Sequence, residues 1–261
     1  MTDKMLSRKE GGVGFVIFNN PERHNAVSLE MWEATKHILD GFAADKDVRV
    51  VVLTGAGGKA FVSGADISKF GSERATLEAQ RAYSVRSEAA YGSIYDFPKP
   101  TIAMIRGYCI GGGLGLATCC DLRICTDNSK FAVPAAKLGL GYGYVGLKRL
   151  VDIVGPSFAK EIFYTARQFD TQEALAMGLV NRVVPSAELE TYVKSITDMI
   201  CANAPLTIKA VKVTVNEILK DETKRDVALT TELVEDCYSS RDYNEGRAAF
   251  MEKRKPVFTG T

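Results

Sequence analysis

The chain has 261 residues, 46% hydrophobic and 25% charged, which is the composition of a globular protein and excludes a disordered, collagen-like or coiled-coil chain. Lysine and arginine total 33 against 32 for aspartate and glutamate, and this balance argues against nucleic acid or an anionic membrane as a partner. Glycine stands out with 23 residues, many of them clustered, and clustered glycines mark places where the backbone approaches another group closely.

Strand and helix patterns alternate over the first two thirds of the chain. Runs rich in β-branched and aromatic residues predict strands at 13–18, 48–54, 101–106, 122–126 and 179–184. Helices are predicted at 29–44, 74–95, 114–120, 147–154, 157–166 and 171–177, and then at 187–202, 208–219, 226–239 and 244–253. We therefore expect an α/β core in residues 1–195 and a C-terminal helical region in residues 196–261.

The sequence gives no sign of targeting, membrane insertion or metal binding. The N-terminus lacks the apolar region of a secretory signal, and no run of about 18 apolar residues occurs. The six cysteines fit neither a zinc site nor a small disulfide framework, and two histidines are too few for a His-rich site. We expect a cytoplasmic protein with reduced cysteines, no metal and no membrane partner.

Three glycine-rich segments are candidates for chemistry, although each could be a plain turn. Gly55–Lys59 lacks the spacing of a P-loop. Gly111–Gly115 follows a strand and opens a helix, but it lacks the third glycine and the later acid of a dinucleotide site, which argues against NAD. It does offer backbone N–H groups at a helix N-terminus, and such donors suit a carbonyl that becomes an enolate or oxyanion. Gly139–Gly146 places Tyr142 and Tyr144 between its glycines.

Several spaced motifs together resemble the crotonase, or enoyl-CoA hydratase/isomerase, superfamily. They are Asn19–Ala26, Phe61–Ile67, Gly107–Gly113, Cys120–Arg123, Leu175–Val184 and Asp242–Pro256. The resemblance covers nearly the whole chain. It implies the α/β crotonase fold, which is ClpP-like, built of stacked ββα units with a C-terminal helical region for trimerisation. It also implies a homotrimer or a dimer of trimers.

The resemblance further implies an acyl-CoA thioester as substrate, in a setting of fatty acid metabolism. Coenzyme A would arrive as part of the substrate, with no tightly bound cofactor. In the family two backbone N–H groups hold the thioester oxygen, and the matching catalytic positions here are Ala65 and Gly112. The substrate-binding positions that it implies are Ala26, Gly64, Asp66, Ile67, Gly111, Gly113, Pro134, Ala135 and Tyr144.

Two carboxylates that hydratases of this family use are replaced in this chain. The first falls at Gly115 and the second, after Pro134, at Ala135. Neither glycine nor alanine can act as a general acid or base. The common isomerases of the family keep the second glutamate, and its dienoyl-CoA isomerases have an aspartate where this chain has Gly143. Ordinary hydration is therefore not expected, and both kinds of isomerisation also lack their carboxylate.

Tyr142 and Tyr144 remain near the expected α-carbon of the thioester. Their loop resembles that of methylmalonyl-CoA decarboxylase, which has a tyrosine at the position of Tyr142 and a histidine at that of Ala65. Decarboxylation needs no base, only stabilisation of the enolate and a donor that orients the departing carboxylate. We therefore expect decarboxylase-like chemistry with Tyr142 as a catalytic residue. The alternative is that both tyrosines simply form the pocket wall.

Two other functions stay open at this point. A hydratase or isomerase could recruit another acid, such as Asp66, Glu73, Glu78 or Glu88, although acids on a helix more often lie on its solvated face. A CoA- or RNA-binding relative without turnover is the third possibility. The balanced charge argues against RNA in that case.

Overall fold

The computed structural model describes residues 2–261, apart from the side chains of Ser72 and Glu73. Within this range one sheet has the strand order β1-β2-β3-β5-β7-β9, parallel throughout except for the antiparallel pair β1–β2. Its strands are β1 (Met5–Glu10), β2 (Val13–Phe18), β3 (Val50–Gly55), β5 (Thr101–Ile105), β7 (Leu122–Thr126) and β9 (Arg182–Val184). A smaller parallel sheet contains β4 (Ala60–Val62), β6 (Tyr108–Ile110) and β8 (Lys130–Ala132).

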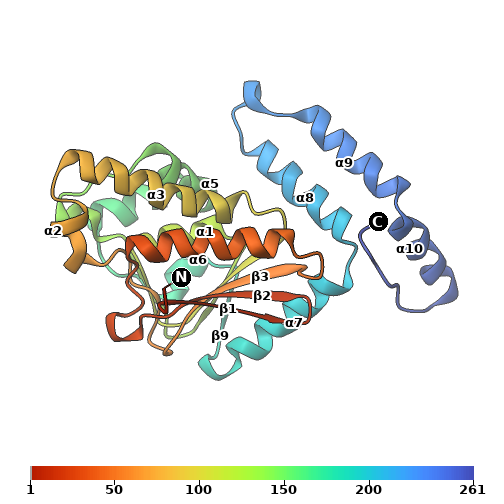
Figure 1. Ribbon diagram of the computed structural model, residues 1–261, viewed down its shortest axis with the longest axis horizontal. Helices are drawn as coiled ribbons and strands as arrows, with labels where there is room; N and C mark the ends of the chain where they lie inside the picture. The colour runs from red at the N-terminus through yellow and green to blue at the C-terminus, as the bar shows by residue number, and fades with distance from the viewer. Residues whose placement is uncertain (1) are drawn as a thin grey trace.

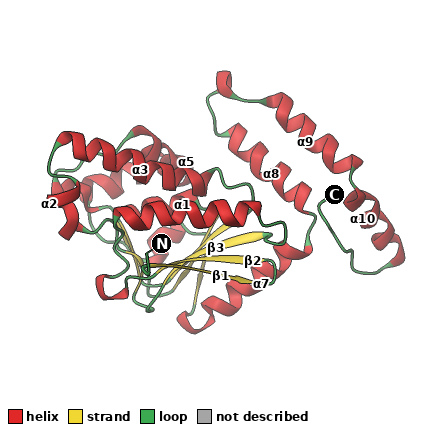
Figure 2. Ribbon diagram, viewed as in Figure 1, coloured by secondary structure: helices red, strands yellow, loops and turns green. Residues whose placement is uncertain are grey.

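Helices cover both faces of the larger sheet (Figures 1 and 2). They are α1 (Leu29–Ala44), α2 (Phe70–Glu73), α3 (Leu77–Tyr95), α4 (Gly112–Cys119), α5 (Tyr144–Thr165), α6 (Thr171–Ala176), α7 (Leu189–Ala202), α8 (Pro205–Ile218), α9 (Val227–Ser239) and α10 (Arg241–Glu252). Helices α1 and α3 lie on one side of the strands and α7 on the other (Figure 2). The two helices predicted at 147–154 and 157–166 are both present within α5, where the non-helical backbone of Gly155 (φ 74°, ψ 169°), just before Pro156, separates them. The predicted α/β fold class is thereby confirmed.

The central strands of the larger sheet are buried on both faces. In β3, Val51 and Leu53 belong to the core that packs against α1, whereas Val50 and Val52 belong to the core that contains Leu189 of α7. Successive side chains of a strand point to opposite faces, so a continuous apolar run fills both cores. This arrangement explains why the sequence of β3 shows no alternation of apolar and polar residues.

The smaller sheet brings together three segments that are far apart in the sequence. Its strands are parallel, so their carboxyl ends lie at the same edge of the sheet. From this edge β4 continues into Gly64 and Ala65, β6 into Gly111 and Gly112, and β8 into a 3-10 helix that starts at Pro134. This sheet is not among the predicted elements, because each of its strands has three residues and leaves no periodic signal.

The chain ends in three helices that extend away from the sheets (Figure 1). The preceding helix α7 packs against the larger sheet and runs through residue 195, so the predicted boundary between residues 1–195 and 196–261 falls inside a helix. That division stays a prediction. The segment after α10, residues 253–261, folds back onto the start of α10. There the Asp242 carboxylate accepts hydrogen bonds from the N–H groups of Thr259 (2.7 Å) and Gly260 (2.9 Å).

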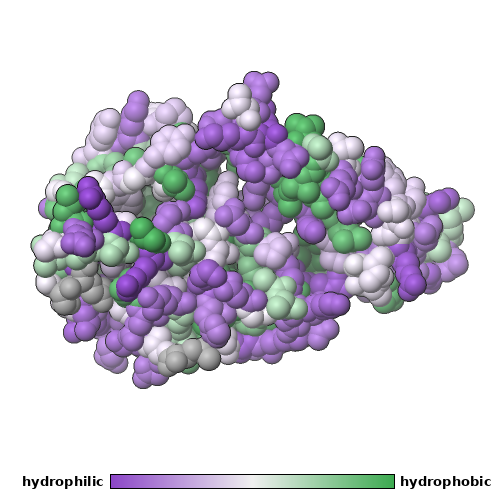
Figure 3. All heavy atoms as spheres, turned by 45° about the horizontal axis from the view of Figure 1, so that its top comes forward, coloured by the Kyte–Doolittle hydropathy of each residue, from purple (hydrophilic) through white to green (hydrophobic). Residues whose placement is uncertain are grey.

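Apolar side chains reach the surface over these C-terminal helices (Figure 3). A groove of about 820 Å³ lies between α8, α9 and α10. Its wall includes Val211, Val215, Val234 and Tyr238, all of which are exposed. This is an apolar surface of the kind that marks protein–protein contacts.

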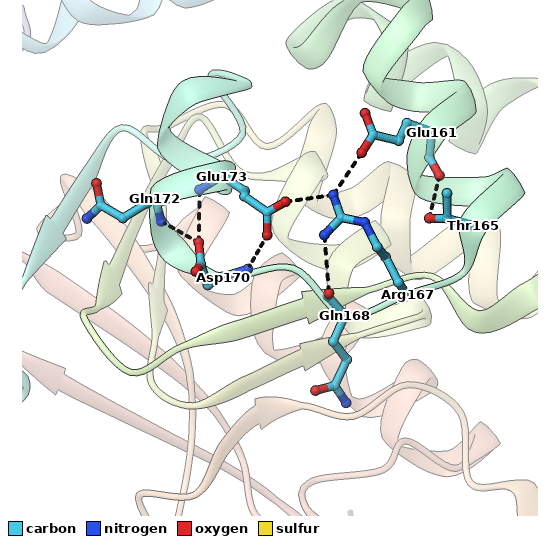
Figure 4. A network of polar contacts seen from close by, with 7 residues as sticks. All are labelled: Glu161, Thr165, Arg167, Gln168, Asp170, Gln172 and Glu173. Carbon is cyan, nitrogen blue, oxygen red and sulfur yellow. Dashed lines mark hydrogen bonds and ion pairs between the residues drawn. The ribbon is translucent and has the colours of Figure 1, made fainter.

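A polar network fixes the turn between α5 and α6 (Figure 4). The Arg167 guanidinium donates to Glu161 of α5 (2.8 Å) and to Glu173 of α6 (2.6 Å). Asp170 and Glu173 form a reciprocal cap at the start of α6, which satisfies N–H groups of its first turn. The same turn contains Phe169, whose backbone pairs with Phe131 of β8, so the network also anchors the smaller sheet.

Within residues 2–261, none of the helices has the length and apolar character needed to cross a bilayer. The described side chains likewise contain no cluster of three histidine, cysteine, aspartate or glutamate residues able to hold a metal ion. Four of the cysteines, Cys109, Cys119, Cys120 and Cys125, are buried. Burial raises the pKa of Cys119 to about 12, which keeps this thiol protonated and unreactive at neutral pH.

Candidate functional site

A cavity of about 430 Å³ opens at the edge where the three short strands end. Most of the predicted site residues line it. These are Gly64, Ala65, Ile67, Gly111, Gly112, Pro134, Ala135, Tyr142 and Tyr144. Helices α3 and α5 supply the opposite wall, and apolar surface predominates in the lining. The cavity is therefore a pocket for a largely apolar group with a few polar contacts at fixed places.

Two backbone amides meet in this cavity without a hydrogen-bond partner. Val27 pairs with both neighbours of Ala65, because its N–H donates to Gly64 (2.8 Å) and its carbonyl accepts from Asp66 (3.0 Å). The Ala65 N–H consequently points away from Val27, and the Gly112 N–H lies in the first turn of α4. Among the described residues neither N–H has an acceptor. A Cβ added to Gly112 would lie 3.7 Å from the Ala65 nitrogen, so the two donors are close enough to serve one oxygen.

Glycine is required at two positions around these amides. Gly64 has a φ of 102°, a conformation that other residues rarely adopt. At Gly113 an added Cβ would overlap the carbonyl oxygen of Val62, so only glycine allows α4 to pack this closely against β4. The glycine excess of the sequence therefore has a structural cause at this site.

Three of the predicted substrate-binding residues do not line the cavity. Ala26 is buried nearby, and Gly113 makes the packing contact with β4. Asp66 turns its carboxylate to the N–H and hydroxyl of Ser68, at 3.1 and 2.7 Å. Burial acts to raise the pKa of Asp66, but the hydrogen bonds from Ser68 and the charge of Arg23 outweigh it and lower the pKa. Asp66 is thus an ionised capping residue beside the cavity.

One face of α3 forms a wall that the sequence analysis missed. Tyr83, Ser87 and Tyr91 recur every four residues, so they share a face of the helix, and all three line the cavity. Tyr91 donates its hydroxyl to the carbonyl of Gly112 (3.0 Å), and Tyr83 accepts from the indole N–H of Trp32 (2.8 Å). This four-residue spacing was the available signal. This spacing does not stand out in the sequence, because the segment is polar overall and resembles a solvated helix.

The wall supplied by α3 also fills the space beside Gly115. A Cβ at Gly115 would lie 3.6 Å from the Tyr91 hydroxyl oxygen, so this tyrosine occupies space that a longer side chain at position 115 would need. Burial raises the pKa of Tyr91 well above its usual value, which keeps the phenol protonated. Ala135 is also buried in the cavity wall. Neither position offers a group that can exchange a proton with water near neutral pH.

Tyr142 lies over the glycine loop that contains the Gly112 amide. Its hydroxyl oxygen would be 4.0 Å from a Cβ on Gly111, and its ring packs edge-on against Phe163, with ring centres 4.9 Å apart. Burial raises the pKa of Tyr142, so its hydroxyl is a neutral hydrogen-bond donor. Tyr144 is 73% exposed and stands at the rim of the cavity.

The charged groups of the cavity are few. Glu88 is the single acid among the described residues that line it, and it forms a 2.8 Å ion pair with the largely buried Arg149 of α5. Glu78 is not part of the lining, and the side chain of Glu73 lies outside what the structure describes. The lining also contains a second arginine, Arg74.

Comparisons with known proteins agree on one family. The sequence profile of the enoyl-CoA hydratase/isomerase family matches residues 8–261. The short-chain-enoyl-CoA hydratase of Clostridium acetobutylicum is 35% identical over 97% of this chain and 96% of its own length. The crotonyl-CoA hydratase of Syntrophomonas wolfei is 34% identical, and the match covers 98% of both chains.

Solved structures give the same result for the fold. An enoyl-CoA hydratase/carnithine racemase from Magnetospirillum magneticum superposes with a TM-score of 0.94 at 38% identity, covering 100% of this chain and 97% of that protein. An enoyl-CoA hydratase from Bacillus anthracis superposes with a TM-score of 0.90 at 30% identity, covering 99% of this chain and all of the other. The expected crotonase fold is thereby confirmed.

Proposed function

Because the chain belongs to the enoyl-CoA hydratase/isomerase family, whose members act on acyl-CoA thioesters, we propose that it binds the thioester oxygen between the N–H groups of Ala65 and Gly112. The observation that carries this proposal is the pair of neighbouring amides without a partner in the cavity. Two fixed donors stabilise an oxygen most strongly when it becomes negatively charged, as in an enolate. Coenzyme A enters as part of the substrate and not as a resident cofactor.

We further propose that the reaction is loss of carbon dioxide from the α-carbon of the thioester. The bond between the α-carbon and its carboxylate breaks, and its electron pair forms the enolate whose oxygen the two N–H groups hold. One proton from solvent then adds to the α-carbon and gives the shortened acyl-CoA. No general base is needed, which agrees with glycine at position 115 and alanine at position 135. The resemblance of the Tyr142 loop to that of methylmalonyl-CoA decarboxylase supports the same reaction.

In this mechanism the hydroxyl of Tyr142 donates a hydrogen bond that orients the departing carboxylate. We expect Tyr142→Phe to lower kcat about tenfold or more, with little effect on the binding of the thioester. Since burial raises its pKa above the usual value, Tyr142 should remain a donor across the neutral range, and loss of the donor should appear only at alkaline pH. Steady-state kinetics from pH 6 to 10 measures both effects. Unchanged turnover in Tyr142→Phe would reduce this tyrosine to a wall residue.

A panel of CoA thioesters tests the proposal as a whole. Enoyl-, methylmalonyl- and β-ketoacyl-CoA are incubated with the protein, and the products are identified by mass spectrometry. Decarboxylation predicts a product that is 44 Da lighter, where hydration would add about 18 Da. Binding of thioesters with no product at all would favour a CoA-binding relative without turnover.

Hydration is the second candidate, because Glu88 lies in the cavity wall and the relatives named above are hydratases. If Glu88 activates water, Glu88→Gln should lower hydration of crotonyl-CoA by about two to four decades, while the amide keeps a hydrogen bond to Arg149. The hydration rate of the variant is the measurement. Hydration that survives this substitution would exclude Glu88 as the base.

We also propose that the chain assembles as a homotrimer or as a dimer of trimers through its C-terminal helices. The exposed apolar side chains of α8 and α9 support this proposal, since such surfaces seldom remain in contact with water. Light scattering coupled to size-exclusion chromatography should give three or six times the chain mass of 28.4 kDa. A monomer at micromolar concentration would contradict the proposal.

A further inference from the structure

Arg74 lies in the wall of the cavity between α2 and α3, away from the glycine loops. Its guanidinium carbon is 4.3 Å from the ring centre of Phe70 and 3.5 Å from that of Tyr83. Both rings are part of the same lining, together with Tyr142. The mechanism proposed above gives Arg74 no role.

None of the carboxylates that the structure describes balances the charge of Arg74. Among the described residues no carboxylate forms an ion pair with it, and its Nε is buried without a hydrogen-bond acceptor. Arg149 in the same cavity differs, because Glu88 neutralises it at 2.8 Å. An arginine charge that no carboxylate balances costs free energy in a largely apolar cavity, and an anion at its terminal nitrogens would offset this cost.

Burial closes off the Nε of Arg74, so its terminal Nη1 and Nη2 groups are the donors that an anion in the cavity would meet. A guanidinium that stacks on aromatic rings uses its faces, whereas its five N–H donors lie in its own plane. These donors match the two oxygens of a carboxylate. The aromatic contacts also hold the side chain in place, so less conformational entropy is lost when a ligand binds.

We infer that Arg74 binds a carboxylate on the acyl chain, so that the preferred substrates are CoA monothioesters of dicarboxylic acids. This inference rests on the proposed function, in which the cavity takes the acyl group. The carboxylate concerned is one that the reaction retains. An ion pair with a departing carboxylate would stabilise the ground state more than the transition state and would slow its loss. If the reaction is decarboxylation, the substrate would therefore carry a second carboxylate besides the one that departs. If the reaction is hydration, the substrate would carry one carboxylate, at the far end of its acyl chain.

Glutaryl-CoA and pentanoyl-CoA provide the test, because both acyl groups have five carbons and only the first ends in a carboxylate. Isothermal titration calorimetry of the full-length protein should give a Kd about ten- to a hundredfold lower for glutaryl-CoA, the range expected for hydrogen bonds between charged groups. Arg74→Met should abolish this preference by weakening glutaryl-CoA alone. Arg74→Lys should retain part of it, since lysine keeps the charge but not the planar pair of donors.

Arg86→Met is the matched control, because Arg86 lies on the neighbouring helix α3 but pairs with Glu33 at the surface (3.5 Å). This variant should keep the full preference for glutaryl-CoA. Equal affinity of the unmodified protein for both thioesters, or a preference that survives Arg74→Met, would overturn the role of Arg74 and leave the proposed function intact. Failure of both thioesters to bind would overturn the proposed function as well. The comparison of the two ligands on the unmodified protein requires no variant to fold.

Discussion

Gly112→Ala is expected to lower kcat about 10²- to 10³-fold on any thioester that the enzyme converts. The added Cβ would lie 3.7 Å from the Ala65 nitrogen and 3.0 Å from the Tyr91 hydroxyl oxygen. An oxygen held by both amides must sit about 2.7–3.1 Å from each nitrogen, so the methyl group would compete for the same space. The expected loss equals that of one donor in an oxyanion hole.

The measurement must separate loss of the oxygen site from loss of folding. Free coenzyme A has no thioester carbonyl, so its Kd should change less than threefold in Gly112→Ala. Gly41→Ala is the matched control, since Gly41 lies on α1 and an added Cβ there meets no atom within 4 Å. Its kinetics should equal those of the unmodified protein. Full activity of Gly112→Ala, with an unchanged thermal midpoint, would show that the two amides do not hold the reacting oxygen.

Five of the six strands of the larger sheet could be predicted from the sequence, the exception being β1 at its edge, whereas the sheet that builds the site could not. Strands such as β3 are long, apolar runs that end at glycine, and this pattern is typical of a parallel strand buried on both faces. The strands β4, β6 and β8 have three residues each and are too short for a periodic signal. Only their pairing places the three site segments at one edge, and pairing is a property of the folded chain.

The backbone part of the site was easier to predict than its side-chain wall. Gly64 and Gly112 belong to the motifs that carry the family resemblance, and at Gly64 an added Cβ would lie 3.1 Å from the backbone carbonyl of Ile110. The side-chain wall comes from the polar helix α3, which supplies Tyr83 and Tyr91, and from the connection before it, which supplies Arg74. In such a polar segment the residues that face solvent and those that face the cavity look alike in the sequence. Asp66 was assigned to substrate binding from its motif position, but its carboxylate is engaged by Ser68. Such a local capping role is common for aspartate and leaves no separate trace in the sequence.

Hydration of crotonyl-CoA by the unmodified protein is expected to be at least about two decades slower than in a hydratase that carries both glutamates. One positioned acid or base typically contributes two to four decades, and neither position 115 nor position 135 holds a carboxylate. Tyr91 has a hydroxyl near the first position, but its raised pKa prevents it from acting as a base near neutral pH. Hydration at the rate of an ordinary hydratase would contradict this reasoning and would direct attention to Glu88.

Restoring one carboxylate should restore part of the proton-transfer chemistry. Ala135 lies in the cavity wall, so Ala135→Glu would place a carboxyl group beside the substrate, and we expect proton transfer at the thioester to rise at least tenfold. Ala135→Gln is the matched control, because its side chain has the same size and no basic oxygen. Exchange of α-protons of butyryl-CoA in deuterated water, followed by mass spectrometry, reports this step without requiring the full hydration reaction. Equal exchange rates in the two variants would show that the missing carboxylate at position 135 does not account for the loss of hydration. The restriction on hydration would then come from the space that Tyr91 fills beside Gly115.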